Sequence, residues 1–472
     1  MVFNSLVFVV FFAIAAAIHH SSLSWRARKC SLLIASYGFY GAWNPPFLIL
    51  LWAATILDFY CALWMERSTT KARRKLFMAL SLCGNLGMLG YFKYGPFLLE
   101  NVSHLVQAFG IDWTPRPWDL LLPVGISFYT FHTLSYTLDV YRGELHARRS
   151  LLDFSLAVTF FPQLVAGPIM RAAAFLPQLE SEKRGSSAQW SNGLTLLVIG
   201  LFQKMVLADG VLAITVDDAY LADGTHSFVD SWVGTFAFSG QIFFDFAGYS
   251  LCALGVARCL GFELIDNFRA PYGAIGFSDF WRRWHISLSS WLRDYLYVSL
   301  GGNRRGRVRT YVNLMLTMLI GGLWHGASWA FVVWGGLHGM YLVIERAVRG
   351  PRPEEPTNPI VIIVSIVLTY LLVCVTWVFF RAPDFTSAWE MVCAMAGFGT
   401  SVPGVLASKV RAAIVLVVIA GMLLSHAFLR KRPLESTLVA MSPWLRAAII
   451  GWMLFLIAVA AGGQRAFIYF QF

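Results

Sequence analysis

The residues best able to do chemistry lie in a glycine-rich motif, Gly-Gly-Leu-Trp-His-Gly, at residues 321–326. Its histidine, His325, is in the middle of an apolar run from Val312 to Ile344, which predicts an imidazole at membrane depth. An ionisable side chain is costly there and by default marks a functional site. A neutral buried imidazole can accept a proton, as a general base must. We therefore predict that His325 is catalytic, although a hydrogen-bonded core histidine would explain the same pattern.

A second histidine, His285, lies in a segment rich in tryptophan and arginine, residues 280–295. Its aromatic and apolar residues recur at three- and four-residue steps, which predicts one amphipathic helix. His285 follows Trp281 by one turn, so it borders the apolar face of that helix. A helix lying at the membrane interface explains the Trp and Arg residues but not this histidine. We predict that His285 orients or polarises a reacting group, and that Trp324 and Trp329 wall the site.

Other uses of these residues are weakly supported. His285 and His325 are 40 residues apart, and no HExxH motif or His/Cys cluster supplies further ligands, so we predict no metal site. His338 lies in the same apolar run but has no carboxylate neighbour before Glu345. The glycine spacing of residues 301–306 matches neither of the known phosphate-binding fingerprints. We also expect no bound cofactor.

The composition indicates which elements must position these side chains. Of the 472 residues, 57% are hydrophobic and 13% are charged, whereas about a quarter of a soluble domain is charged. So few charges cannot build a water-facing surface. The sequence therefore predicts an all-α polytopic membrane protein, with a single integral membrane domain over residues 1–472 that contacts membrane lipids.

The apolar segments predict about eleven transmembrane helices, since each crossing needs about 20 apolar residues. Several segments are too short to cross alone, and prolines at positions 45, 46 and 168 interrupt them, which favours additional re-entrant or interfacial helices. Phe3–Ile18 has no basic residues before it, so we expect a retained helix rather than a signal peptide.

The formal charge of +11 is spread over several short basic clusters between the apolar segments. A nucleic-acid-binding protein would gather these residues on one element, so we expect no nucleic-acid partner. The long loop that is poor in basic residues, Thr215–Ser231, is acidic. Counting spans from an exterior N-terminus puts the early basic clusters in the cytoplasm, which is typical of a multi-pass protein of the cell inner membrane.

Two motifs together resemble the membrane-bound O-acyltransferase family. Trp-His-Ile-Ser-Leu-Ser-Ser-Trp-Leu-Arg-Asp at residues 284–294 is followed by Gly-Leu-Trp-His-Gly at residues 322–326. The resemblance is strongest to the bacterial branch that O-acetylates alginate and related exopolysaccharides. Further stretches are similar to that branch, at residues 122–131, 161–169, 377–382 and 467–472. His132 departs from it, because we expect glutamine there.

The resemblance implies a ring of tilted helices around a central funnel, with His325 as the catalytic histidine on its floor and His285 as the second motif histidine. It also implies a cytoplasmic acyl donor, with acetyl-CoA the expected one, a polysaccharide acceptor outside, and extracytoplasmic acetyltransferase partner proteins. We therefore predict an O-acyltransferase that moves an acetyl group towards hydroxyls of a polysaccharide such as alginate.

Two alternatives remain open at this stage. D-alanyl transfer to teichoic acid from a carrier protein would use the same fold. A proton-coupled transporter or flippase would use intramembrane histidines as a relay, but it should show repeated halves with paired broken helices, and none are visible.

Overall fold

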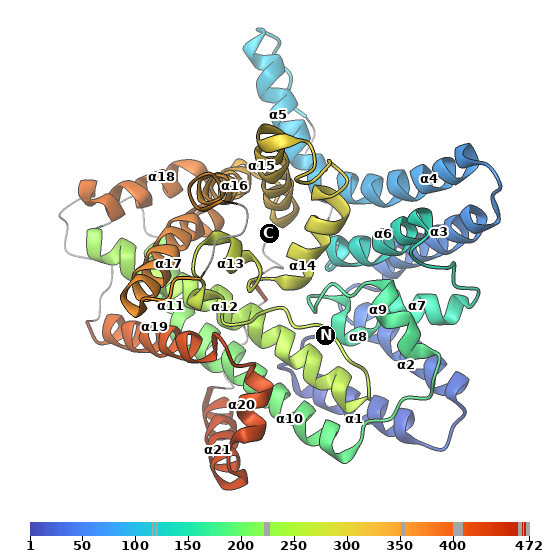
Figure 1. Ribbon diagram of the computed structural model, residues 1–472. Helices are drawn as coiled ribbons and strands as arrows, with labels where there is room; N and C mark the ends of the chain where they lie inside the picture. The colour runs from blue at the N-terminus through green and yellow to red at the C-terminus, as the bar shows by residue number, and fades with distance from the viewer. Residues whose placement is uncertain are drawn as a thin grey trace. The chain divides into compact units, whose positions relative to one another are not determined.

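The computed structural model describes residues 1–115, 118, 121–220, 227–350, 355–399, 409–460, 465, 467 and 468. Within these ranges the chain forms helices and no β-strand, which confirms the predicted all-α fold (Figure 1). Helices satisfy every backbone N–H and C=O inside one segment, as the bilayer requires. The chain divides into two compact units, Met1–Leu194 with Ala253–Ile265 and Thr195–Cys252 with Asp266–Phe472.

The first unit contains nine complete helices among its described residues. They are α1 (Leu6–His20), α2 (Trp25–Gly41), α3 (Leu48–Arg67), α4 (Lys71–Leu89), α5 (Gly95–Ala108), α6 (Ile126–Arg142), α7 (Leu151–Thr159), α8 (Phe161–Leu164) and α9 (Ala172–Phe175), together with the first half of α10 (Ser187–Leu201). The helix predicted near Phe3–Ile18 is present as α1, and its N-cap is the Ser5 side chain. The predicted interruptions are also present, since Pro45–Phe47 forms a 3-10 turn before α3 and Pro168 lies between α8 and α9. The apolar segment before Pro168 is itself divided, because α7 ends at Thr159.

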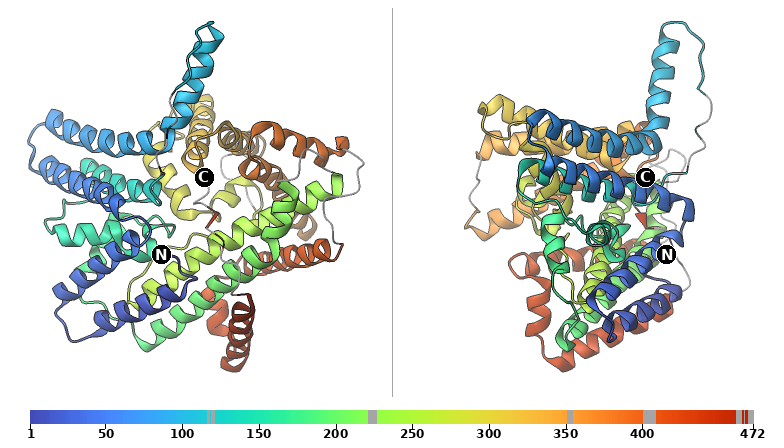
Figure 2. Two further views of the ribbon diagram at one scale, coloured as in Figure 1. Left: turned by 180° about the vertical axis from the view of Figure 1, so that it is seen from behind. Right: turned by 90° about the vertical axis from the view of Figure 1, so that its right-hand side faces the viewer.

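Helices α3, α4 and α6 pack against one another in the first unit, as Figure 2 shows from behind. A fully buried carboxyl group, that of Asp58 on α3, lies among them. It accepts hydrogen bonds from Ser81 Oγ at 2.5 Å and from Asn85 Nδ2 at 2.9 Å. Thr133 on α6 donates to Asn85 Oδ1 at 3.1 Å. These four residues, the Asp58 cluster, satisfy one another's polar groups, as burial requires.

A cluster of three charged residues in the first unit joins α2 and α7. Lys29 Nζ lies 2.5 Å from Asp153 Oδ1, and Arg148 Nη2 lies 2.9 Å from Asp153 Oδ2. Asp153 is also in the first turn of α7, where the Ser150 side chain caps the helix. A carboxylate with two cationic partners at a helix N-terminus is well stabilised.

The second unit contains the remaining helices. They are α11 (Ala213–Tyr220), most of α12 (Phe228–Cys259), α13 (Phe277–Trp281), α14 (Ile286–Trp291), α15 (Gly306–His325), α16 (Trp329–Arg349), α17 (Pro359–Arg381), α18 (Phe385–Cys393), α19 (Lys409–Leu429), α20 (Leu434–Ala440) and α21 (Pro443–Ala460). A π-helical segment, Phe202–Leu212, precedes α11. The predicted acidic loop lies partly on α11, which carries Asp217 and Asp218, and its residues 221–226 lie outside the described part of the chain.

Helices α15 and α16 form a closely packed hairpin around two glycines. A Cβ atom added to Gly322 would collide with the carbonyl oxygen of Phe331, and one added to Gly335 would collide with that of Met318. Small residues let membrane helices approach until their backbones touch. This close crossing fixes where the C-terminal end of α15 meets the first turns of α16.

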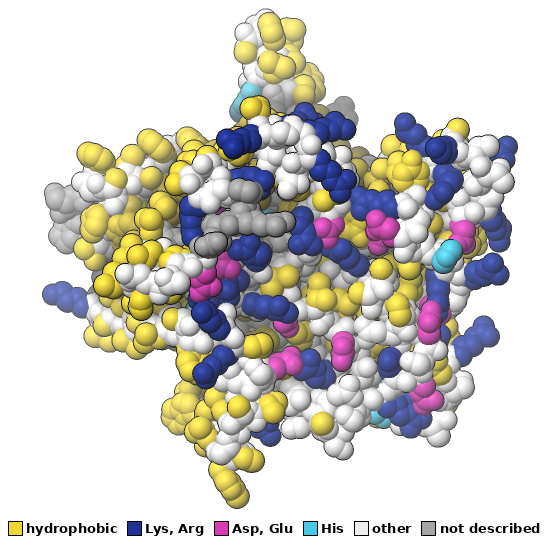
Figure 3. Space-filling view, in the orientation of Figure 1, with side chains coloured by type: hydrophobic (Ala, Val, Ile, Leu, Met, Phe, Trp, Pro, Cys, Tyr) yellow, Lys and Arg dark blue, Asp and Glu magenta, His cyan; other side chains and the backbone are white. Residues whose placement is uncertain are grey.

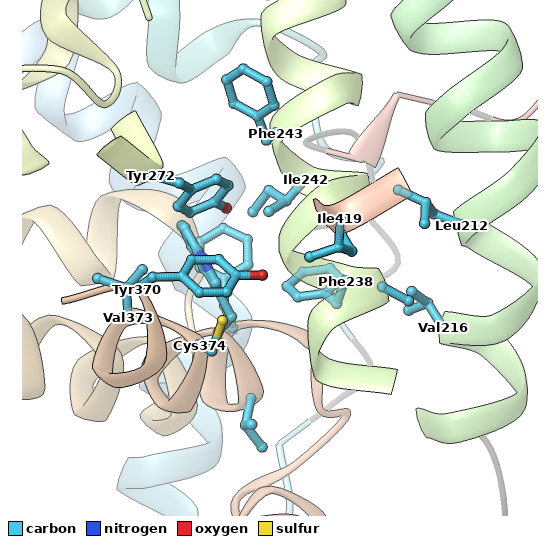
Figure 4. Close-up of a cluster of buried hydrophobic side chains, with 14 of the residues drawn as sticks. Leu212, Val216, Phe238, Ile242, Phe243, Tyr272, Tyr370, Val373, Cys374 and Ile419 are labelled. Atoms are coloured by element: carbon cyan, nitrogen blue, oxygen red, sulfur yellow. The ribbon is translucent and has the colours of Figure 1, made fainter. Parts of the chain in front are cut away.

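The apolar core of the second unit joins α12 to α17 and α19. Figure 4 shows Phe238 and Ile242 from α12 against Tyr370 and Cys374 from α17 and Ile419 from α19. One polar contact in this core joins α12 to α17, since Ser239 Oγ lies 2.8 Å from Tyr370 Oη. The packed core holds α17 in place, and α17 in turn packs on α16.

Seven helical segments among the described residues are long and apolar enough to cross a membrane: Pro45–Arg67, Lys71–Ala108, Ser187–Tyr220, Phe228–Cys259, Pro359–Arg381, Lys409–Leu429 and Pro443–Ala460. The predicted number of about eleven is therefore not confirmed. Large apolar side chains are exposed on these helices, for example Trp444 and Val459 on α21, and Figure 3 shows hydrophobic atoms over α21. Such surfaces suit contact with lipid.

Candidate active site

His325 is the last residue of α15, and its side chain is 4% exposed. The helix stops there because Gly326 adopts an extended conformation, and a Cβ atom at Gly326 would collide with the Phe331 ring. The imidazole lies among aromatic rings, with centroid distances of 5.0 Å to Trp334 and 5.4 Å to Phe380. The site therefore places an imidazole at a helix end inside an apolar, aromatic shell.

His285 is fully buried and connects α13 to α14. Its backbone is left-handed, with φ 42° and ψ 53°, which costs a residue with a Cβ atom roughly 1–3 kcal/mol. Asn267 holds the following residues in place, since its carbonyl oxygen accepts from Ile286 N at 3.0 Å and its Oδ1 accepts from Ser287 Oγ at 2.6 Å. Strained residues held by their surroundings occur mostly at functional sites.

The predicted continuous helix over residues 280–295 is therefore wrong. The chain forms two short helices, α13 and α14, and a π-helical turn from Leu292 to Tyr297. The break at His285 turns its ring towards His325 instead of leaving it on a helix margin. Periodicity alone misses this break, because both short helices keep three- and four-residue steps.

The structure brings the two predicted histidines together. The ring centroids of His285 and His325 are 6.1 Å apart, and Trp324 lies 4.9 Å from His325 and 5.9 Å from His285. Phe246 on α12 completes the wall, with its ring 4.6 Å from that of His285. Trp324 thus lies beside both histidines, and its role as a wall of the site stays a prediction.

Trp329 is placed differently. It is the first residue of α16 and its side chain is 59% exposed. Its predicted role as a wall of the site stays a prediction.

Three residues near the site were not predicted from the sequence. Trp334 and His338 lie four residues apart on α16, with ring centroids 4.8 Å apart, and Trp281 on α13 lies 5.1 Å from His338. The four-residue spacing on α16 is a signal that a search for helix faces could have used. Trp281 could not have been placed, because its contact with α16 joins distant parts of the chain.

No three His, Cys, Asp or Glu side chains are grouped closely enough to hold a metal ion among the described residues. Two imidazoles in an aromatic shell can accept and return a proton, or act as a nucleophile. Both activities suit acyl transfer, in which a hydroxyl must lose a proton as it attacks a carbonyl carbon.

Comparison with known proteins agrees with this chemistry. The sequence model of the membrane-bound O-acyltransferase family (MBOAT) matches residues 47–380. The chain is 40% identical over 405 residues to the "Probable alginate O-acetylase AlgI" of Pseudomonas aeruginosa, covering 85% of this chain and 76% of the relative. It is 34% identical over 432 residues to the peptidoglycan O-acetyltransferase of Helicobacter pylori, covering 84% and 80%.

A more distant relative is the teichoic acid D-alanyltransferase of Bacillus subtilis. It is 26% identical over 285 residues, which cover 57% of this chain and 71% of the relative. The matched family region contains α3 to most of α17, and so includes His285, His325 and the close crossing of α15 and α16. The apolar helices make the chain a multi-pass membrane protein. The protein is an O-acyltransferase that belongs to the membrane-bound O-acyltransferase family.

Proposed function

We propose that the protein transfers an acetyl group from acetyl-CoA to hydroxyls of an extracytoplasmic polysaccharide such as alginate. The observation that supports this most directly is the pair of buried imidazoles, His285 and His325, 6.1 Å apart in an aromatic shell. The name of the Pseudomonas aeruginosa relative supports alginate as the acceptor, over 85% of this chain. The likeness to the D-alanyltransferase covers only 57%, which favours acetyl over D-alanyl transfer.

In this proposal His325 takes the proton of the acceptor hydroxyl while its oxygen attacks the thioester carbonyl carbon. The new C–O bond forms as the C–S bond breaks, and the imidazolium returns the proton to the leaving thiolate. A second route begins with attack by His325 itself, which releases the thiol and gives an acetyl-imidazole that the hydroxyl then attacks. In both routes His285 orients or polarises the reacting group, and Trp324 excludes water.

The proposal includes the cell inner membrane as the location. Acetyl-CoA is a cytoplasmic compound and the polysaccharide is outside, so the transfer has to connect the two sides. Extracytoplasmic acetyltransferase partner proteins would complete the transfer by bringing the hydroxyls of the polymer to the site. The early basic clusters support a cytoplasmic side for the donor, because basic residues favour cytoplasmic loops.

The experiment is transfer of radiolabelled acetyl from acetyl-CoA to alginate in membranes that contain the protein. A general base contributes about 10²–10⁴ in rate, so His325→Ala should lose nearly all transfer while its folding stays normal. His104→Ala is the matched control, because His104 is exposed on α5. Transfer at the wild-type rate by folded His325→Ala would disprove the proposed role.

The same experiment separates the two routes. Label that stays on the protein after denaturation, and disappears in His325→Ala, indicates an acetyl-imidazole. Label that moves only to polymer indicates direct attack by the hydroxyl.

A further inference from the structure

A third buried histidine, His338, has a fixed hydrogen-bonding state. Its Nε2 lies 3.0 Å from Thr376 Oγ1 on α17, and the same hydroxyl donates to the carbonyl oxygen of Val373 at 2.7 Å. The single proton of the hydroxyl is used in the second bond, so Thr376 can only accept from His338. Nε2 therefore carries the hydrogen of the neutral ring, and Nδ1 is left as an acceptor.

Nδ1 of His338 has no hydrogen-bond partner among the described residues. The indole nitrogens of Trp281 and Trp334 also have none within the part of the chain that the structure describes. All three atoms are buried, and the three rings meet edge to face, with centroids 4.8 to 5.8 Å apart. In native proteins a buried donor or acceptor without a protein partner is usually satisfied by water or a ligand, so three such atoms on contacting rings mark a candidate binding position.

The two indole donors and the imidazole acceptor that lack partners are together complementary to one kind of ligand. Indole N–H groups only donate, and His338 Nδ1 only accepts. An alcohol oxygen accepts two hydrogen bonds and donates one, which matches two indoles and one imidazole nitrogen. A thioester carbonyl could use the indoles but would leave Nδ1 unmet.

The position of this group of residues connects it to the reaction. Trp334 contacts both His338 and His325, with centroid distances of 4.8 and 5.0 Å. The Trp334 ring therefore connects this group of residues to the histidine that is predicted to act as base.

We propose that Trp281, Trp334 and His338 form a subsite that binds a hydroxyl group of the sugar acceptor. This inference rests on the proposed acetyl transfer to a polysaccharide and names the residues that recognise the acceptor. His338 and the two indoles bind the hydroxyl, and His325 acts on the reacting atoms. The alternative is that the three rings only pack, with N–H groups over ring faces.

Two substitutions of the same histidine separate these roles. The amide of His338→Gln reaches the position of Nε2 and can keep the bond to Thr376, but it has no atom at the position of Nδ1. The shorter amide of His338→Asn places a polar atom near Nδ1 and gives up the bond to Thr376. A packing role favours glutamine, whereas a hydroxyl-binding role favours asparagine.

The experiment measures transfer of labelled acetyl in permeabilised membranes, with acetyl-CoA and alginate varied separately. Loss of one hydrogen bond to a buried ligand predicts that His338→Gln raises the KM for alginate about tenfold. The KM for acetyl-CoA should stay unchanged, and His338→Asn should stay within about threefold of the wild type. Trp281→Phe should change KM in the same direction, because it removes only an N–H donor and a small part of the ring.

Trp284→Phe is the matched control for Trp281→Phe. Trp284 follows Trp281 by three residues and is fully buried, but it has no ring contact with His338 among the described residues. Equal activity of the two His338 variants, or better activity with glutamine, would overturn the subsite. An increase in the KM for acetyl-CoA instead of alginate would also overturn it. A folded wild type that transfers no acetyl to alginate contradicts the proposed function itself, so the two failures are distinguishable.

Discussion

The Asp58 cluster in the first unit is built differently from the histidine cluster of the second, which consists of His285, His325, His338, Trp281 and Trp334. Both are polar groups buried among apolar helices. Asp58, Ser81, Asn85 and Thr133 use their polar atoms on one another. His338 and its two indole neighbours leave donors and an acceptor without partners among the described residues. The Asp58 cluster is complete by itself, and the histidine cluster is complementary to a further group.

The difference teaches how to separate structural from functional polar groups in a membrane protein. A self-satisfied cluster stabilises helix packing and gains nothing from a ligand. A cluster with unmet groups is less stable alone and gains hydrogen bonds when a ligand arrives. Substitutions in a self-satisfied cluster should therefore lower stability and leave the rate of transfer unchanged. Substitutions in a cluster with unmet groups should lower the rate of transfer and leave stability nearly unchanged.

The largest expected effect belongs to His285. His285→Ala should lower transfer by about 10²–10⁴-fold, by analogy with loss of a group that handles the reacting atoms. Alanine keeps the Cβ atom that strains the backbone at residue 285, so the rates are compared per folded molecule, with folding checked by thermal unfolding in detergent. A stable His285→Ala protein with wild-type transfer would place His285 with the structural residues and would remove the contrast.

Asp58→Ala should give the reverse pattern. It leaves the buried side chains of Ser81 and Asn85 without their acceptor, which should destabilise the protein by about 3 kcal/mol. Transfer per folded molecule should stay at the wild-type level. Asp58→Asn is the control, because an amide of the same shape keeps an acceptor for Ser81 and should cost less. A lower rate in folded Asp58→Ala protein would show that the Asp58 cluster has a functional role.

The close crossing of α15 and α16 tests whether the histidine cluster depends on its scaffold. Gly335→Val puts a side chain against the carbonyl oxygen of Met318 and should destabilise the hairpin by about 1–3 kcal/mol. It should also lower transfer, because Gly335 adjoins Trp334. Gly336→Ala is the neighbouring control, since its Cβ would meet only Leu319 Cδ2 at an ordinary 3.6 Å. Equal melting temperatures for the two variants would contradict the role of the crossing.

The smallest effect concerns Asp153, on a helix that is not among the seven apolar spans. Burial alone would raise the pKa of its carboxyl, but Lys29 and Arg148 outweigh it and hold the pKa below its ordinary value. A lowered folded-state pKa gives stability that is present above the unfolded pKa and is lost as pH falls through the folded one. The melting-temperature difference between wild type and Asp153→Asn should therefore be constant near neutrality and shrink below about pH 4. A difference independent of pH would show that the ion pairs contribute nothing.

The sequence predicted the all-helical fold and the membrane character, because composition reveals both. His325 was singled out by the cost of an ionisable group at membrane depth, and His285 by its place beside an apolar face and by the family resemblance. The contact between the two rings came only from the structure. The break at His285 was missed, because a left-handed residue between two short helices leaves the apolar spacing unchanged.

The role of His338 was also out of reach from the sequence. The tautomer of His338 depends on its contact with Thr376, and the proposed subsite also needs Trp281. Both residues are brought to α16 only by tertiary packing. Trp329 shows that a residue close to His325 in the sequence need not line the site, because its side chain is exposed. The last four residues of the similar C-terminal stretch, 469–472, lie outside the described part of the chain.

The hydrogen bond from Thr376 to the Val373 carbonyl has a consequence in a membrane that maintains a proton gradient. A proton can hop along a chain of hydrogen bonds only if each acceptor has a proton to pass on, and a peptide carbonyl has none. The path from His338 through Thr376 therefore stops at the Val373 oxygen. Charge picked up during catalysis cannot leak away through α17, so along this route the enzyme would not dissipate a proton gradient.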